Sequence, residues 1–296
     1  MRVLLLFPMQ DLQTGPAIKY AFEKLGHEVG AVDAKLWPTT SYKLATLFKP
    51  DLVFCSRTYQ LTEQIEQIKR KFKDTTICMW NVDTRDTLQA WEYLFPLVKL
   101  CDYHFVVDTH LLSEWKELNP STFWLPQGLQ NEVYHKPDRI SKSDILKYEC
   151  DVSFAGMRGG FHAWREPYLQ AIEKMGVNFK YWQGIYGEDH NKMVACSKIN
   201  LSISYVNEYA VSVRDYKIMG AGGFLLELYR DGLFKIFPMD TIATFKTLAD
   251  ISDLIDACLK ASLTREKIAE NGHDWVHKNS TYTHRISRAL EIMRMK

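Results

Sequence analysis

The sequence predicts an α/β protein with two doubly wound parallel-sheet domains. In the first half, short apolar segments typical of strands alternate with segments of helical periodicity, and the connections between them are short. A second series of the same kind begins near residue 150. The length of 296 residues suits two domains of about 140–150 residues, each large enough for a core of its own.

The first series opens with the continuous apolar segment MRVLLLF, which is typical of a central parallel strand buried on both faces. Gly15 and Pro16 open a helix that runs to Leu25, because proline suits the first helical position. Further strands are expected at 26–34, 51–56, 76–83, 102–108 and 122–126, and helices at 61–73, 87–100 and 111–118. Ligands of such sheets bind beyond the carboxyl ends of the strands, which places loops 9–15, 81–86 and 108–110 at the binding edge.

A punctuated segment at 124–138 connects the two series, and the polar residues 139–150 are expected to form a linker. We place the boundary near residue 140, which gives domains 1–140 and 141–296. The second series is expected to hold strands at 151–156, within 178–187, at 199–204 and at 224–228, and to close with helical segments at 251–263, 265–280 and 281–295.

Residues 197–237 are predicted to form a strand, a polar loop, a short helix, a glycine turn and another strand. Ser212 is suited to cap the helix, which begins near Val213. Three closely spaced glycines end it, namely Gly220, Gly222 and Gly223. They would let the backbone approach a ligand or another strand.

The start of this helix is a candidate phosphate site. A helix that begins behind a loop presents unpaired N–H groups and the positive end of its dipole. Arg214 lies in the first turn, where its guanidinium could donate two hydrogen bonds to a diphosphate. The alternative is that Arg214 is solvated, as most surface arginines are.

The loop after the strand at 151–156 is a second candidate for phosphate contacts. Gly156 would let the backbone approach a phosphate, and Arg158 or Arg165 could neutralise diphosphate charge. Arg165 could instead pair with Glu166 or Glu173 on a helix surface. Aromatic residues near these loops could stack on a nucleobase, although most aromatic residues belong to cores: Tyr181, Trp182, Tyr186, Tyr205 and Tyr209.

In the first half, two residues are candidates for acid–base chemistry. Asp83 ends a strand, where a carboxylate could take a proton from an acceptor hydroxyl, or could merely cap the next helix. His110 follows another strand end, whereas His104 lies inside a strand and is expected in the core. The loop before Gly15 lacks the G-x-G-x-x-G spacing of dinucleotide sites. Gly15 either brings the backbone close to a bound diphosphate, or simply starts a helix.

Composition limits the other possibilities. The net charge of +1 gives no general attraction to nucleic acid, so such a partner would need a local basic patch. The first apolar run is too short to span a membrane or act as a signal segment, and we expect a cytoplasmic protein. The six cysteines are widely separated and lack metal-ligand spacing, so we expect free thiols and neither zinc nor disulfides.

Taken together, the segments SVRDYKIMGAGGFLLE, LFKIF and IAENGHDWVHKNSTYTHRISRAL resemble the carboxyl-terminal domain of GT-B glycosyltransferases, and most closely the CgeB-like (spore maturation) group. The resemblance covers residues 150–290 well and the first half more loosely. It assigns donor contacts to Gly156 and Arg165, places Asp83 beside the acceptor, and implies that the last helix crosses back to the first domain. Segment 124–138 resembles the connection between GT-B domains.

One position departs from the family pattern. Lys217 stands where the group has a glutamate thought to hold the ribose of the nucleotide, and lysine cannot accept a hydrogen bond from a hydroxyl. Either a nearby carboxylate, such as Asp215 or Glu227, serves instead, or donor binding is altered or lost.

The resemblance implies two Rossmann-like domains that face a cleft, and a metal-independent, hexosyltransferase-type enzyme without a cofactor. Its donor would be a nucleotide sugar, foremost a UDP-sugar, and its acceptor a hydroxyl of a glycan, protein, small molecule or nucleic-acid base. Predicted donor and phosphate contacts are Gly15, Gly156, Arg158, Arg165, Ser212, Arg214, Asp215, Lys217, Gly222 and Gly223, and predicted catalytic residues are Asp83 and His110. Two alternatives are a non-catalytic nucleotide- or sugar-binding or structural protein on the same fold, favoured by Lys217, and a nucleotide-sugar epimerase.

Overall fold

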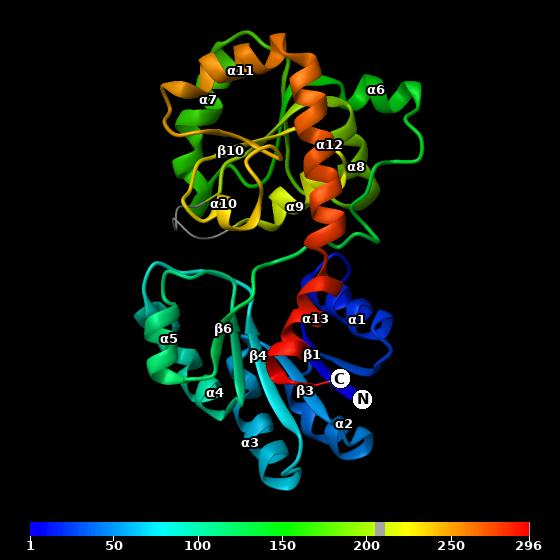
Figure 1. The fold of residues 1–296 in the computed structure, drawn as a ribbon, viewed down its shortest axis with the longest axis vertical. Coiled ribbons are helices and arrows are strands. Elements are labelled where there is room, and N and C mark those ends of the chain that lie inside the picture. Colours follow the sequence, from blue (N-terminus) through cyan, green and yellow to red (C-terminus); the bar gives the residue numbers. More distant parts are fainter. Residues whose placement is uncertain (205–210, 296) are drawn as a thin grey trace. The chain divides into compact units, whose positions relative to one another are not determined.

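The computed structural model describes residues 1–204 and 211–295, and the chain divides into two compact units. The first unit comprises Met1–Gln127 and Tyr282–Lys296, and the second comprises Gly128–Thr281 (Figure 1). The boundary that we expected near residue 140 therefore lies within the second unit.

A parallel sheet of six strands forms the centre of the first unit, in the order β2-β1-β3-β4-β5-β6. Its strands are β1 Arg2–Phe7, β2 Glu28–Asp33, β3 Leu52–Ser56, β4 Thr76–Asn81, β5 Tyr103–Val106 and β6 Thr122–Trp124. Its helices and 3₁₀ turns are α1 Thr14–Lys24, η1 Pro38–Thr40, α2 Ser41–Phe48, η2 Tyr59–Leu61, α3 Thr62–Lys71, η3 Leu88–Leu94, α4 Phe95–Leu100, α5 Leu112–Leu118 and α13 Tyr282–Met293.

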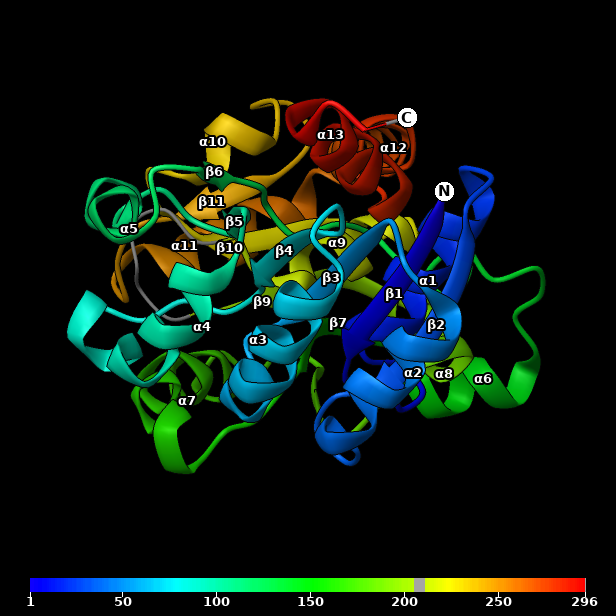
Figure 2. The same ribbon diagram turned by 90° about the horizontal axis from the view of Figure 1, so that it is seen from below.

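Strand β1 shows why the sheet is covered on both faces. Val3, Leu5 and Phe7 pack in a core with α1 and α13, whereas Leu4 and Leu6 pack in a second core with α2 to α5. Figure 2 shows α2 and α3 on the opposite side of the sheet from α13. Side chains alternate between the faces of a strand, so a continuous apolar run requires apolar cover on both sides. The predicted helix at 87–100 is instead the turn η3 followed by α4, which carries a proline near its start.

The carboxyl-terminal helix α13 belongs to the first unit and lies beside α1 (Figure 1). Ile286 and Ala289 are fully buried in the core that it shares with α1. Polar contacts add to this packing, because Tyr282 donates its hydroxyl to Gln127 Oε1 at 2.8 Å and Arg285 Nε donates to the Gln127 carbonyl at 2.8 Å.

The second unit contains a parallel sheet of five strands in the order β11-β10-β9-β7-β8. Its strands are β7 Cys150–Ala155, β8 Phe179–Trp182, β9 Ser197–Ser202, β10 Leu225–Leu228 and β11 Ala243–Phe245. Its helices and 3₁₀ turn are α6 Lys142–Tyr148, η4 Gly160–Arg165, α7 Glu166–Lys174, α8 Gly187–Ala195, α9 Val213–Gly220, α10 Leu233–Ile236, α11 Asp250–Lys260 and α12 Ser262–Asn279. The prediction of two doubly wound parallel sheets is confirmed.

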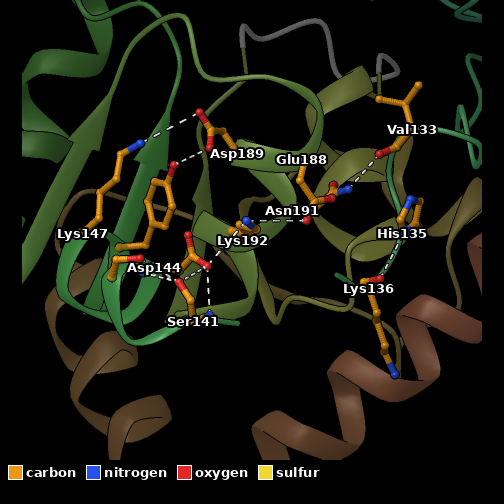
Figure 3. A network of polar contacts seen from close by, with 12 residues as sticks. Val133, His135, Lys136, Ser141, Asp144, Lys147, Glu188, Asp189, Asn191 and Lys192 are labelled. Carbon is orange, nitrogen blue, oxygen red and sulfur yellow. Dashed lines mark hydrogen bonds and ion pairs between the residues drawn. The ribbon is translucent and has the colours of Figure 1, made fainter. Parts of the chain in front are cut away.

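Part of the expected linker at 139–150 is helical. Ser141 accepts a hydrogen bond from the Asp144 backbone N–H, and the Asp144 carboxylate accepts one from the Ser141 backbone N–H, which together form a capping box for α6. Figure 3 shows this helix joined to α8 through Lys192, whose ammonium lies 3.5 Å from Asp144. The S-x-x-D spacing was the sequence signal for this helix.

Candidate functional site

The second unit holds a pocket of about 380 Å³ at a point where the strand order reverses. The chain leaves β7 toward β8 on one side and returns to β9 on the other, and ligands of open α/β sheets bind at such a reversal of strand order. The pocket is lined by Ala155, Gly156, Met157, His162, Arg165, Gly184, Ile185, Tyr186, His190, Ser212, Arg214 and Lys217.

The first turn of α9 positions Arg214 on this pocket. The Ser212 hydroxyl accepts a hydrogen bond from the Arg214 backbone N–H at 3.2 Å, which confirms the predicted cap. The guanidinium lies 5.2 Å from the centre of the Phe154 ring, and its Nε donates to the Ala155 carbonyl at 2.7 Å. Its Nη1 is buried without a hydrogen-bond partner. Desolvation lowers the pKa of Arg214, so an anion at Nη1 would stabilise the charged form.

Gly156 makes room for this guanidinium. A Cβ atom at position 156 would lie 2.7 Å from Arg214 Nη2. Because that is closer than carbon and nitrogen normally approach, a side chain here would displace the arginine. The role predicted for Gly156 was backbone contact with a phosphate, and the structure adds that this glycine permits the position of Arg214.

Arg165 lies against the same aromatic ring as Arg214. Its guanidinium is 5.7 Å from the Phe154 ring centre, and it donates through Nε to the Ile203 carbonyl at 2.7 Å and through Nη1 to the Met157 carbonyl at 2.8 Å. Burial and the positive charge of Arg214 lower the pKa of Arg165 to about 10, which leaves it charged at neutral pH. The backbone carbonyls orient this cation without neutralising it.

Lys217 is the third cation of the pocket, one helical turn beyond Arg214. Its ammonium lies 4.6 Å from the Tyr134 ring centre and 5.6 Å from that of Tyr186. Desolvation and the charge of Arg214 lower the pKa of Lys217 to about 8. Among the residues that the structure describes, no aspartate or glutamate lines the pocket, so the three cations share it without a carboxylate.

Two histidines line the same pocket and were absent from the sequence-based predictions. His190 of α8 is almost completely buried, and burial together with Lys217 and Arg214 lowers its pKa to about 3. The pKa of His162 is lowered as well, by burial and by Arg165 and Arg214. Both rings are therefore neutral near pH 7. His190 could not be marked from the sequence, because only the tertiary fold brings α8 to this pocket. His162 lies in η4, within the loop after β7 that the sequence did mark, but no spacing singled it out.

Asp215 lies away from the pocket in a buried polar network. Its carboxylate accepts from the Ser202 hydroxyl at 2.6 Å and lies 3.4 Å from Arg230, which also pairs with Glu227 at 2.6 Å. Burial and the charge of Asp215 raise the pKa of Glu227. Of the two carboxylates considered as substitutes for the family glutamate, neither lines the pocket.

Three further predicted donor residues also lie outside the pocket lining. Arg158 is held by two carboxylates, with Glu166 at 2.8 Å and Glu173 at 2.6 Å. Gly222 has a φ of +79° at the end of α9, a conformation that favours glycine. A Cβ at Gly223 would lie 2.4 Å from Val194 Cγ1, so the close approach that this glycine permits is to the protein itself.

In the first unit, both residues that were predicted for acid–base chemistry contact other polar groups. Asp83 forms an ion pair with Arg57, whose guanidinium lies 5.7 Å from the Trp91 ring centre. His110 Nδ1 lies 2.7 Å from Asp108 Oδ1, and its Nε2 lies 2.7 Å from the Arg85 carbonyl oxygen. Both ring nitrogens of His110 thus face oxygen acceptors.

The remaining predicted positions differ in their surroundings. A Cβ at Gly15 would lie 2.2 Å from the Pro8 carbonyl oxygen, so the glycine allows the start of α1 to approach the segment just after β1. His104 is fully buried, and burial lowers its pKa to about 3. Tyr186 lines the pocket and is half exposed. Tyr205 and Tyr209 lie outside the described residues.

Within 1–204 and 211–295, no group of three or more histidine, cysteine, aspartate or glutamate side chains is arranged to hold a metal ion. Over the same residues, every helix is too short or too polar to cross a membrane.

Comparison with known proteins gives the family and the fold. The family described as "Glycosyl transferase-like" matches residues 142–291, which is more than half of the chain. No curated protein matches the sequence.

Three solved structures illustrate the similarity in fold. HepE of Anabaena, solved with UDP and glucose, has a TM-score of 0.68 at 11% identity and covers 99% of each chain. Sucrose-phosphate synthase of Thermosynechococcus elongatus has a TM-score of 0.68 at 10% identity, covering 99% of this chain and 98% of its own. A glycosyltransferase of Rickettsia africae has a TM-score of 0.70 at 10% identity, covering 99% and 97%.

At such low identity these structures establish the fold, which is GT-B, and the family match establishes the relationship. The chain belongs to the glycosyl transferase-like family.

Proposed function

We propose that the pocket of the second unit binds the diphosphate of a nucleotide-sugar donor, and that the protein transfers the sugar to an acceptor hydroxyl. The observation that carries this proposal is the pair of guanidinium groups stacked on Phe154, one of which has a buried Nη1 without a partner. A buried donor without an acceptor is unfavourable, and a phosphate oxygen would satisfy it.

The charge of the pocket also favours a diphosphate. Arg165 and Arg214 remain positive at neutral pH, and Lys217 adds a third positive charge below about pH 8. A diphosphate that links a nucleoside to a sugar carries two negative charges. Cations fixed in a partly buried pocket would bind this group and stabilise the additional charge that develops on it as the sugar leaves.

We propose a UDP-sugar as the donor to test first. HepE, which shares the fold, has been solved with UDP-glucose. We further propose that the chain belongs to the CgeB-like group, that it needs neither a metal nor a cofactor, and that it acts in the cytoplasm. The acceptor remains one of the four hydroxyl classes named above.

The reaction would be a displacement at the anomeric carbon. The bond from this carbon to the diphosphate oxygen breaks, its electron pair stays on the diphosphate, and a bond to the acceptor oxygen forms. The acceptor proton passes to a general base, for which we propose Asp83. His110 is a weaker candidate, because both of its ring nitrogens already face oxygen atoms.

A non-catalytic nucleotide-sugar-binding protein is the second candidate function. The ion pair between Asp83 and Arg57 favours it, since a base must be free to accept a proton. A binding protein would bind a nucleotide sugar but would transfer its sugar neither to water nor to any hydroxyl acceptor, so no UDP would be released.

The test is a titration of UDP-, GDP- and TDP-sugars by calorimetry and thermal shift, with and without EDTA, together with an assay of nucleotide release. We expect a UDP-sugar to bind and Arg214→Ala to weaken its binding by about 2 kcal/mol, or roughly thirtyfold. Arg158→Ala is the matched control, because this arginine lies in the same unit but is held by two glutamates. Equal losses in both variants, or no binding of any nucleotide sugar, would contradict the proposal.

A further inference from the structure

The pocket contains an acceptor as well as cations. Lysine and arginine side chains carry only hydrogen-bond donors, so Arg165, Arg214 and Lys217 cannot accept a hydrogen bond from a ligand hydroxyl. A neutral imidazole has one nitrogen that donates and one that accepts. His190 lines the pocket as such a ring.

His190 has an unsatisfied polar atom. The side chain is 3% exposed, and its Nδ1 is buried without a hydrogen-bond partner. The ring packs edge-on against Tyr134, with 5.3 Å between the ring centres. A buried imidazole nitrogen without a partner is unfavourable, and a hydroxyl of a bound ligand would satisfy the ring.

The helix that carries His190 is held on both sides of this residue. Asp189 accepts a hydrogen bond from the Tyr148 hydroxyl at 2.8 Å, and Asn191 Nδ2 donates to the Val133 carbonyl at 2.7 Å. Figure 3 shows Asp189 and Asn191 pointing in different directions from α8, with Asn191 directed toward Val133. Anchors on both neighbours fix the orientation of the ring between them, so it is pre-organised for a ligand.

The neighbouring charges keep the ring able to accept. Lys217 and Arg214 are the charged groups that act on His190, and both disfavour a second proton on the ring. Because the ring does not titrate near neutral pH, it contributes hydrogen bonding rather than charge.

We propose that His190 accepts a hydrogen bond from a hydroxyl of the bound nucleotide sugar, and that it thereby selects ligands that carry this hydroxyl. The inference rests on the proposed function, because it takes the ligand of the pocket to be a nucleotide sugar. The hydroxyl could belong to the ribose or to the transferred sugar, and both offer the same chemistry.

The experiment compares affinities for ligands that each lack one hydroxyl. UDP is compared with its 2′- and 3′-deoxy forms, and UDP-glucose with its singly deoxygenated hexose forms, by calorimetry. We expect wild-type protein to bind the complete ligand about tenfold more tightly than one of these analogues. His190→Phe should bind both members of that pair equally, while His190→Gln, which keeps an acceptor, should retain part of the preference.

His104→Phe is the matched control. His104 is also buried and neutral, but it lies in the core of the first unit beside Trp115. This variant should keep the full preference, even if both phenylalanine variants lose some thermal stability. The preference of the wild type for the complete ligand should also be the same at about pH 5 and about pH 7, because a neutral ring does not titrate in this range. A histidine that instead bound phosphate through its positive charge would lose affinity between these two pH values.

Three results would overturn the inference. The first is that wild-type protein binds every deoxy analogue as tightly as the complete ligand. The second is that His190→Phe keeps the wild-type preference for the complete ligand. Both would leave the proposed function intact. Failure of UDP, UDP-glucose and the GDP- and TDP-sugars to bind at all would overturn the proposed function together with the inference.

Discussion

The pocket of the second unit and the strand ends of the first unit differ in whether their charged side chains lie beside a partner of opposite charge. In the pocket, Arg165, Arg214 and Lys217 have no carboxylate among the described lining residues. At the strand ends of the first unit, Asp83 pairs with Arg57, and His110 with Asp108. Burying a cation that has no carboxylate beside it is unfavourable in free energy unless a ligand supplies the negative charge. Residues that are already paired do not need a ligand for this purpose. The contrast supports our proposal that the anionic ligand binds to the second unit.

The largest effect that we expect is on the turnover of a variant at Asp83. In Asp83→Asn we expect donor affinity to stay within twofold and turnover to fall about a hundredfold, because an amide cannot accept the acceptor proton. The measurement is UDP release from UDP-glucose, with donor affinity determined separately by calorimetry. Unchanged turnover would remove Asp83 from the base role.

The next effect is the pH dependence of donor binding. Lys217 has a pKa of about 8 in the free protein, and its charged form attracts the diphosphate. Affinity for UDP-glucose should therefore be full below about pH 7 and fall about tenfold by pH 9, because the ammonium loses its proton over that interval. UDP-glucose is the suitable probe, since its diphosphate has no group that titrates there.

The Lys217→Met variant provides the control for this pH dependence. At pH 7 the variant should bind UDP-glucose more weakly than the wild type does. Its own affinity should be the same at pH 7 and at pH 9. A wild-type affinity that does not change with pH would show that Lys217 does not act on the diphosphate.

The smallest effect is expected for the paired arginine of the first unit. Arg57→Ala should leave UDP affinity within twofold, in contrast to the roughly thirtyfold loss expected for Arg214→Ala. Because the ion pair of Arg57 with Asp83 is half exposed, its loss should lower stability by less than about 1 kcal/mol. Calorimetry and thermal denaturation measure these two quantities. A large loss of UDP affinity in Arg57→Ala would break the distinction between the two units.

Much of the fold could be predicted from local patterns. Continuous apolar strands, the Ser212 cap and the glycines after α9 act over a few residues, so the sequence displays them directly. The capping box of Ser141 and Asp144 was equally local, and we missed it because the polar composition of 139–150 suggested a linker. The sequence could also predict that Arg165 and Arg214 line one pocket, because both follow the ends of predicted strands.

The sequence by itself determined two parallel sheets and a basic helix start at the edge of one of them, because strand and helix periodicity and capping depend on neighbouring residues. Only the tertiary structure decided which polar groups share the pocket. It turned Asp215 inward to Ser202 and Arg230, engaged Arg158 with two glutamates, and brought His190 to the cations. The physical reason is that the direction of a side chain and its loss of solvent depend on elements far apart in the chain, whose packing no local pattern records.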